Sequence, residues 1–321
     1  MRVEVDDYHT GGEPFRIVTA GVPPLAGTTI LERRRYAREH LDAYRRFLVF
    51  EPRGHADMYG CHVVPPNDSG ADVGVVFFHN EGYSTACGHG TIALVTWALD
   101  TGVVERREGE NHVTVDVPSG RVQTWATVED GRVRSVRFRN VPSYVWARDV
   151  PAAGRRVDVA FGGAFYATVE ERVEPAELAR LIALGRELKA ALEAEHDVVH
   201  PLEPELRDVY GVIFWQHEAD EPLTQRNVTV FADGEVDRSP CGSGTSARLA
   251  LLHDQGRLAV GEELRHRSIV GSEFVGRVVA EAEVAGRPAV VTEVEGTAYR
   301  TGRASFELDP DDPLGEGFLL R

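Results

Sequence analysis

The sequence predicts an α/β protein with two pseudo-equivalent halves, each presenting a cysteine at the start of a helix. Three observations support this prediction. The chain has 321 residues, which is enough for two packed domains. Most of it reads as strands separated by turns rich in glycine and proline, with a few helical segments between them. A C-G-x-G-T-x-A pattern occurs twice, at residues 87–93 (CGHGTIA) and 241–247 (CGSGTSA).

Strand and helix signals follow one another along the chain. Three segments alternate apolar and polar residues as half-buried strands do: residues 113–117, 133–138 and 228–231. One helix is predicted at residues 91–99, ending near Gly102, and another at residues 244–253, ending at Gly256. The longest helix begins at Pro175, since proline suits a first helical turn. Its apolar residues share one face: Leu178, Leu181, Ile182, Leu188 and Leu192.

The repeated pattern places Cys87 and Cys241 at helix N-termini. Unpaired N–H groups and a partial positive charge at such a terminus lower the pKa of a thiol and bind carboxylates. With an amino-acid carboxylate held by both helix starts, one thiolate can remove the α-proton while the other thiol protonates the opposite face. The pattern therefore predicts stereoinversion by two cysteines. The alternative is that both are small core residues, the usual fate of free cysteine, and this is the role expected for Cys61.

The composition limits the binding partners and the cellular compartment that we expect for this chain. A net charge of −16 argues against binding to nucleic acid, and the basic run at residues 32–35 is expected on a solvated helix face. No apolar run is long enough to span a bilayer, and the N-terminus has no signal-peptide pattern, so a cytoplasmic location with no membrane partner is expected. Whether the chain forms a homodimer is left open.

A cofactor and a metal are both expected to be absent. Lys189 is the only lysine, and it lies in a helical pattern where an exposed charge is the simplest interpretation. Unless Lys189 forms a Schiff base, pyridoxal phosphate is excluded. The three cysteines form no C-x-x-C pair, and the twelve histidines show no metal-binding spacing such as H-E-x-x-H.

Several motifs resemble those of the proline racemase family, over essentially the whole chain. They are residues 7–14 (DYHTGGEP), 51–60 (EPRGHADMYG), 80–83 (NEGY), 87–91 (CGHGT), 161–166 (FGGAFY), 237–246 (DRSPCGSGTS) and 270–272 (VGS). The resemblance implies two α/β domains, each a curved, mostly antiparallel sheet around a central helix as in diaminopimelate epimerase, with the active site between them. We expect residues 1–118, completed by residues 300–321, to form the first domain and residues 119–299 the second.

The resemblance also implies roles for individual residues. Cys87 and Cys241 would be the acid/base pair. The substrate carboxylate would be bound by the backbone N–H groups of four residues at the two helix starts: Gly88, His89, Gly242 and Ser243. His89 and Asp237 would face the ring nitrogen of the substrate, and Tyr59 and Phe231 would wall its ring.

Within the family, the motifs favour one branch. The Cys-Gly-His-Gly-Thr form is more similar to hydroxyproline epimerases than to proline racemases. Members that dehydrate trans-3-hydroxyproline carry threonine in place of Cys241, so cysteine there favours stereoinversion. Residues 84–86 (STA) depart from the usual lead-in containing leucine and methionine.

The expected function is therefore 4-hydroxyproline 2-epimerase, with proline or hydroxyproline as the small-molecule substrate. A proline racemase and a trans-3-hydroxyproline dehydratase are the enzymatic alternatives. A binding protein for cyclic amino acids on the same scaffold and a thiol redox sensor are the non-enzymatic ones.

Overall fold

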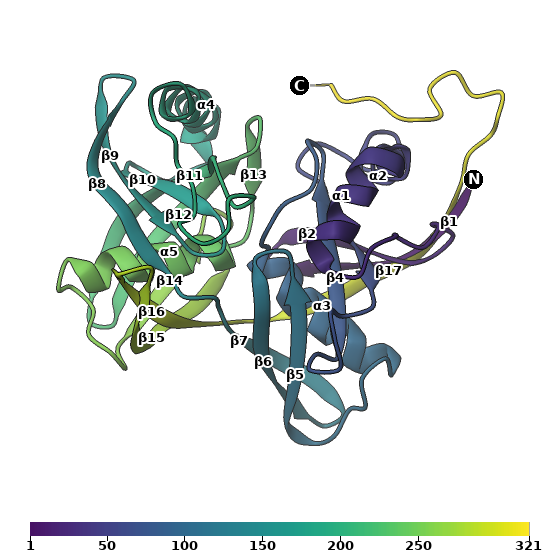
Figure 1. Ribbon diagram of the computed structural model, residues 1–321, viewed down its shortest axis with the longest axis horizontal. Helices are drawn as coiled ribbons and strands as arrows, with labels where there is room; N and C mark the ends of the chain where they lie inside the picture. The colour runs from purple at the N-terminus through teal and green to yellow at the C-terminus, as the bar shows by residue number, and fades with distance from the viewer. Residues whose placement is uncertain (321) are drawn as a thin grey trace. The chain divides into compact units, whose positions relative to one another are not determined.

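The computed structural model describes residues 1–320, which divide into two compact units (Figure 1). The first unit contains residues 1–136 together with the C-terminal segment from Thr297, and the second contains residues 137–296. The C-terminal segment belongs to the first unit because its strand pairs with the N-terminal strand of the chain.

The first unit consists of strands and three helices. In chain order they are β1 (Arg2–Thr10), β2 (Glu13–Ala20), α1 (Ile30–His40), α2 (Asp42–Val49), β3 (Tyr59–Val64), β4 (Val73–His79), α3 (Gly88–Thr101), β5 (Gly109–Val117), β6 (Gly120–Glu129) and β17 (Ala298–Glu307). Strand β7 (Arg132–Arg139) runs from the first unit into the second.

The second unit has the same kinds of elements. They are β8 (Tyr144–Ala152), β9 (Arg155–Phe161), β10 (Phe165–Glu170), a 3-10 turn at Pro175–Glu177, α4 (Leu178–Glu195), β11 (Val209–Asp220), β12 (Leu223–Phe231), β13 (Glu235–Asp237), α5 (Gly242–Asp254), β14 (Glu263–Ser268), β15 (Glu273–Val284) and β16 (Arg287–Gly296).

The two units share one topology, which confirms the predicted pseudo-equivalent halves. In the first, neighbouring strands run β17-β1-β2-β3-β4-β5-β6, with β2/β3 and β4/β5 parallel and the other pairs antiparallel. In the second, the order β8-β9-β10-β11-β12-β14-β15 has parallel pairs at the same two places, β10/β11 and β12/β14. The helix that carries the repeated motif follows β4 in one unit and β12–β13 in the other.

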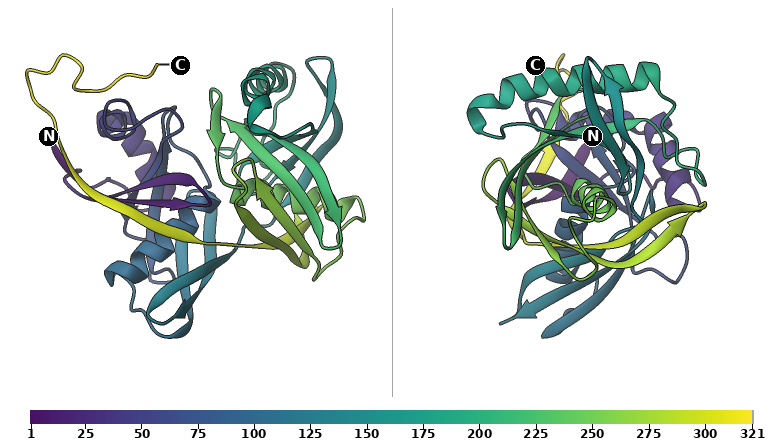
Figure 2. Two further views of the ribbon diagram at one scale, coloured as in Figure 1. Left: turned by 180° about the vertical axis from the view of Figure 1, so that it is seen from behind. Right: turned by 90° about the vertical axis from the view of Figure 1, so that its left-hand side faces the viewer.

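The helices α3 and α5 are enclosed by the strands of their own units (Figures 1 and 2). Every residue of α3 from Gly88 to Leu99, and every residue of α5 from Gly242 to Leu252, is buried. Helix α3 packs against β1, β2 and β17, and α5 packs against β8, β9 and β15. A helix buried on all sides is held by the surrounding sheet, and this fixes the position of the residue at its start.

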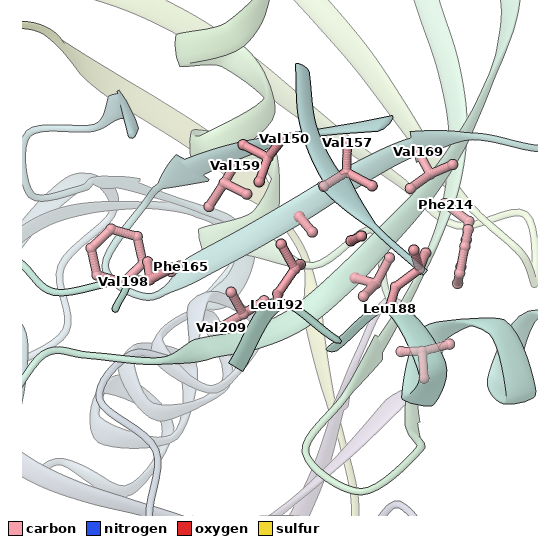
Figure 3. Close-up of a cluster of buried hydrophobic side chains, with 14 of the residues drawn as sticks. Val150, Val157, Val159, Phe165, Val169, Leu188, Leu192, Val198, Val209 and Phe214 are labelled. Carbon is pink, nitrogen blue, oxygen red and sulfur yellow. The ribbon is translucent and has the colours of Figure 1, made fainter. Parts of the chain in front are cut away.

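Helices α1, α2 and α4 cover other faces of the sheets. Leu188 and Leu192 of α4 belong to the apolar core of the second unit with Val209 and Phe214 of β11 (Figure 3). Helices α1 and α2 contact β4 in the first unit. The predicted apolar face of α4 is therefore confirmed.

Comparison with the predicted elements shows agreement and two differences. The three predicted strands lie within β5, β7 and β12, and the three predicted helices correspond to α3, α4 and α5. Helices α1 and α2 were not predicted. The expectation of a solvated basic run was partly wrong, because Arg33 is buried and donates a hydrogen bond to the carbonyl of Pro65 at 2.5 Å.

Candidate active site

Cys87 is the N-cap residue of α3. Its backbone is extended, with φ −153° and ψ 100°, and its Sγ accepts a hydrogen bond from the N–H of Gly90 at 3.2 Å. Thr91 donates twice to the Cys87 carbonyl, from its N–H at 2.9 Å and from its hydroxyl at 2.8 Å. The Cys87 sulfur thus satisfies an amide that the first helical turn leaves unpaired, and the Thr91 N–H makes the first hydrogen bond of the helix.

The second glycine of the motif gives the thiol its space. A Cβ on Gly90 would lie 2.6 Å from Cys87 Sγ, closer than the van der Waals contact of two such atoms, and would also strike the ring of Phe15. In the second unit, a Cβ on Gly244 would lie 2.9 Å from Cys241 Sγ. Both halves therefore require glycine at this position for the same reason.

An imidazole lies beside Cys87, and two aromatic rings pack against that imidazole. The Nε2 and Nδ1 atoms of His89 lie 3.4 and 3.6 Å from Cys87 Sγ. The ring of His89 packs edge-on against Tyr59, with centroids 5.0 Å apart, and against Phe15 at 5.8 Å. Thr10 fixes the backbone there by donating to the His89 carbonyl at 2.9 Å. Cys87, Gly88, His89 and Tyr59 are called the Cys87 cluster below.

Cys241 precedes α5 in an unusual backbone conformation. Its φ of 62° lies in the left-handed region, which costs a non-glycine residue of order 1 kcal/mol or more. The turn before it is held by Asp237, whose Oδ1 accepts from the N–H of Ser239 at 2.8 Å and from its hydroxyl at 2.7 Å. The Ser239 hydroxyl oxygen in turn accepts from the Cys241 N–H at 3.1 Å.

Burial raises the pKa of the Cys241 thiol to about 12, and the charge of Asp237 acts in the same direction. The neighbouring Gly244 amide and the hydroxyls of Thr229 and Tyr166 favour the thiolate but do not offset burial. The pKa lowering expected from the helix N-terminus is therefore outweighed at Cys241.

Tyr166 links Cys241 to the start of α5. Its hydroxyl lies 2.7 Å from the Ser243 hydroxyl and accepts a hydrogen bond from the Cys241 thiol at 3.8 Å. Phe231, at the end of β12, stacks on Tyr210 with centroids 5.4 Å apart. Five residues are called the Cys241 cluster below: Asp237, Cys241, Gly242, Ser243 and Phe231.

The structure gathers the predicted site residues into these two clusters, one in each unit. Tyr166 and Ser239 were not singled out from the sequence, although the family-like segments at 161–166 and 237–246 contain them, and Ser84 was noted only as part of the departure at residues 84–86. The signal for Ser84 and Ser239 is a hydroxyl close to a candidate cysteine in the sequence, whereas Tyr166, in β10, has no such signal.

The contacts and burial of Lys189 and Cys61, which were also considered from the sequence, are those of structural residues. Lys189 pairs with Glu193 at 2.8 Å along α4. Cys61 is fully buried in β3, and burial raises the pKa of its thiol. Within residues 1–320 there is no group of three His, Cys, Asp or Glu side chains placed to hold a metal ion, and no helix is long and apolar enough to cross a membrane.

Curated relatives cover nearly the whole chain. The 3-hydroxyproline 2-epimerase of Burkholderia multivorans is 49% identical over 98% of this chain and 97% of its own. The trans-3-hydroxy-L-proline dehydratases of Burkholderia ambifaria and Bacillus cereus are 48% and 46% identical over the same shares.

Solved structures agree in fold. A hydroxyproline epimerase from Agrobacterium vitis with bound trans-4-hydroxy-L-proline has a TM-score of 0.92 and 34% identity, covering 99% of this chain and 95% of its own. A phenazine biosynthesis protein of the PhzF family from Bacillus anthracis, 12% identical with a TM-score of 0.64 over 96% of this chain and 100% of its own, shares the fold alone. The sequence profile described as proline racemase matches residues 5–319. The chain therefore belongs to the proline racemase family.

Proposed function

We propose that this protein inverts the α-carbon of a hydroxyproline by proton transfer between Cys87 and Cys241, without a cofactor. The observation that carries the proposal is the repeated placement of a thiol at the start of a buried helix, in two units of the same topology. A reversible inversion needs an acid and a base that can exchange roles, and two thiols of the same type provide them.

The helix starts supply the carboxylate-binding groups. The first amides of α3 and α5, at Gly88, His89, Gly242 and Ser243, lie in the first helical turns, at the positive ends of the helix dipoles. Hydrogen bonds from these amides would stabilise the charge that develops on the carboxylate oxygens when the α-proton leaves. His89 and Asp237 would contact the ring nitrogen, and Tyr59 and Phe231 would wall the ring.

The two cysteines would start from different protonation states. The raised pKa keeps Cys241 protonated at neutral pH, the state required of the proton donor. Cys87 would then act as the base for the isomer bound first, while Cys241 delivers its proton to the opposite face. The product leaves the thiol on Cys87 and the thiolate on Cys241, ready for the reverse direction.

The ring position of the hydroxyl is the finer part of the proposal. The sequence motifs alone favoured 4-hydroxyproline. Relatives named for 3-hydroxyproline are 46–49% identical to this chain, whereas the structure with bound trans-4-hydroxy-L-proline is 34% identical. These identities support 3-hydroxyproline as the first substrate, followed by 4-hydroxyproline and proline.

A second candidate is dehydration of trans-3-hydroxy-L-proline, because several relatives carry that name. Removal of the α-proton with loss of the ring hydroxyl as water would give an enamine that tautomerises to Δ1-pyrroline-2-carboxylate. Cys241 supports inversion instead, because the family resemblance associates dehydration with threonine there.

The deciding experiment is proton NMR in D2O with 3-hydroxyproline, 4-hydroxyproline and proline. We expect loss of the α-proton signal and appearance of the epimer, identified by chiral chromatography. A pyrroline product would support dehydration. Thermal stabilisation by these amino acids without any α-proton exchange would instead support a binding protein and contradict the proposal.

A further inference from the structure

We propose that Ser84, held by Tyr59, selects substrates that carry a ring hydroxyl. This inference rests on the proposed function, because it concerns the same substrate. Ser84 lies in the loop between β4 and α3, three residues before Cys87, and it is buried. It belongs to the stretch at 84–86 in which the sequence departs from the lead-in usual for the family.

Contacts within the first unit connect Ser84 to the Cys87 cluster. The hydroxyl of Tyr59 donates a short hydrogen bond to Ser84 Oγ. The ring of Tyr59 packs edge-on against His89, with centroids 5.0 Å apart, and the ring nitrogens of His89 lie 3.4–3.6 Å from Cys87 Sγ. Ser84 is therefore fixed by the residue proposed to wall the substrate ring.

The hydrogen-bonding capacity of Ser84 is only partly used. A serine hydroxyl can accept at two lone pairs and donate one proton. Tyr59 fills one lone pair, and no acceptor for the Ser84 proton occurs within residues 1–320. A buried donor without an acceptor is costly, so a ligand oxygen at this place is stabilised. The ring hydroxyl of a hydroxyproline supplies that oxygen, and proline does not.

The position that corresponds to Ser84 in the second unit carries no hydroxyl. Three residues before Cys241 stands Arg238, whose guanidinium donates to the Val236 carbonyl at 3.1 Å. The pseudo-equivalence of the two units is thus broken at this position.

The chemistry explains why one such contact is sufficient. Inversion moves the α-proton from one face of the ring to the other, but it leaves the carbon that bears the hydroxyl unchanged. The hydroxyl therefore stays on one side of the ring in both substrate and product. A donor on one unit can hold it through both directions of the reaction, whereas the acid/base groups must be present on both.

The test compares kcat/KM for hydroxyproline with kcat/KM for proline, both followed by α-proton exchange in D2O. Ser84→Ala should lower this ratio about tenfold, because a site built to bond a hydroxyl favours the ligand that carries one. Tyr59→Phe, which keeps the ring but releases Ser84, should lower it about threefold. Competitive inhibition by proline gives a second measure: its inhibition constant should fall about tenfold relative to the KM for hydroxyproline in Ser84→Ala.

Two matched variants control for general damage to the fold. Ser143→Ala removes a buried serine hydroxyl that bonds a backbone carbonyl in the second unit, and Tyr83→Phe removes a buried tyrosine hydroxyl that bonds the Ala37 carbonyl. Both should keep the wild-type ratio. An unchanged ratio in Ser84→Ala, or equal losses on both substrates, would overturn this assignment alone. Absence of exchange on every cyclic amino acid with the wild-type chain would overturn the proposed function instead.

Discussion

The two helix starts are alike in backbone plan and different in chemical surroundings. Both place a cysteine before a buried helix, and both need glycine three residues later to make room for the sulfur. Cys87 has an extended backbone and accepts a capping hydrogen bond from Gly90. Cys241 has a φ of 62° and no such side-chain cap. The two helix starts therefore share the glycine that makes room for the sulfur but differ in the backbone conformation of the cysteine.

The neighbours of the two thiols differ further. Cys87 lies beside an imidazole, whereas Cys241 lies near the Tyr166 phenol and the charge of Asp237. The proposed inversion needs a thiol on each face of the substrate ring. The substrate is not symmetric, however, because its nitrogen and its ring hydroxyl each occupy one position, and only one of the two thiols holds the proton before the reaction. In the proposed mechanism, the shared elements would carry proton transfer and the divergent ones would carry substrate recognition.

Replacing either cysteine with serine should have the largest effect. Serine keeps the shape but cannot form an anion at neutral pH, so each of Cys87→Ser and Cys241→Ser should lower kcat for epimer formation about 1,000-fold. Chiral chromatography of the product measures this. Cys61→Ala, which changes a cysteine buried in the core of the first unit, should keep kcat within about twofold. Full activity in both serine variants would contradict the two-thiol mechanism.

Replacing the spacing glycines tests whether both sulfurs need the same room. Gly90→Ala should lower kcat/KM about 100-fold, since its Cβ would lie 2.6 Å from Cys87 Sγ and strike Phe15. Gly244→Ala should lower kcat/KM about tenfold, because the added Cβ would lie 2.9 Å from Cys241 Sγ and 3.0 Å from the Ile213 side chain. Better helix propensity of alanine, about 1 kcal/mol, does not relieve either clash. Gly302→Ala, where a Cβ meets open space, is the control. Equal losses at both glycines would mean that the two starts are equally crowded.

The sequence predicted the shared elements better than the divergent ones, for physical reasons. The repeated motif itself identifies both cysteines, because a helix that begins next to a cysteine sulfur needs glycine and threonine at fixed positions. The left-handed backbone of Cys241 leaves no such signal, since it depends on the Asp237–Ser239 turn. Tyr166 reaches Ser243 from a distant strand, so only the folded sheet brings them together.

The missed helices show the same limit. Helix α1 carries a recognisable start signal, since Thr29 and Glu32 form a capping box. Its buried Arg33 and the buried Arg45 of α2 look like solvent-exposed residues in the sequence. Each is stabilised by backbone carbonyls, of Pro65 for Arg33 and of His79 for Arg45. Such partners lie in other elements, and the local pattern does not reveal them.

Alkaline pH should lower the free energy of unfolding, because the Cys241 thiol is buried and its pKa is raised. An unfolded thiol has a pKa of about 8.5, and the folded value is about 12. Between these values the unfolded chain loses the proton while the folded chain keeps it, so stability is complete below about pH 8.5 and falls progressively toward pH 12. At pH 10 the ionisation of this thiol in the unfolded chain should lower the free energy of unfolding by about 2 kcal/mol, which is a roughly 30-fold rise in the unfolding equilibrium constant.

Urea unfolding of the wild type and of Cys241→Ser at pH 8 and pH 10 measures this contribution. The serine variant should lose less stability over this range, because serine does not titrate. Cys61→Ala should reduce the loss as well, since burial also raises the pKa of Cys61. Identical losses in wild type and Cys241→Ser would show that the folded thiol ionises as readily as the unfolded one.

The smallest effect should come from the Tyr166 phenol, which lies beside the second helix start. Tyr166→Phe removes the hydrogen bond to Ser243 and the contact with Cys241 Sγ, so kcat/KM should fall about fivefold, the value of one neutral hydrogen bond. Tyr144→Phe is the matched control, because that buried hydroxyl has no partner within residues 1–320 and its removal should leave kcat/KM unchanged. A positioning role also predicts that alkylation of Cys241 by iodoacetamide shifts to higher pH in Tyr166→Phe, since a donor that favours the thiolate is lost. An unshifted alkylation profile together with the activity loss would assign Tyr166 to substrate binding through Ser243. Burial and the charge of Asp237 would then remain as the causes of the raised pKa of the Cys241 thiol.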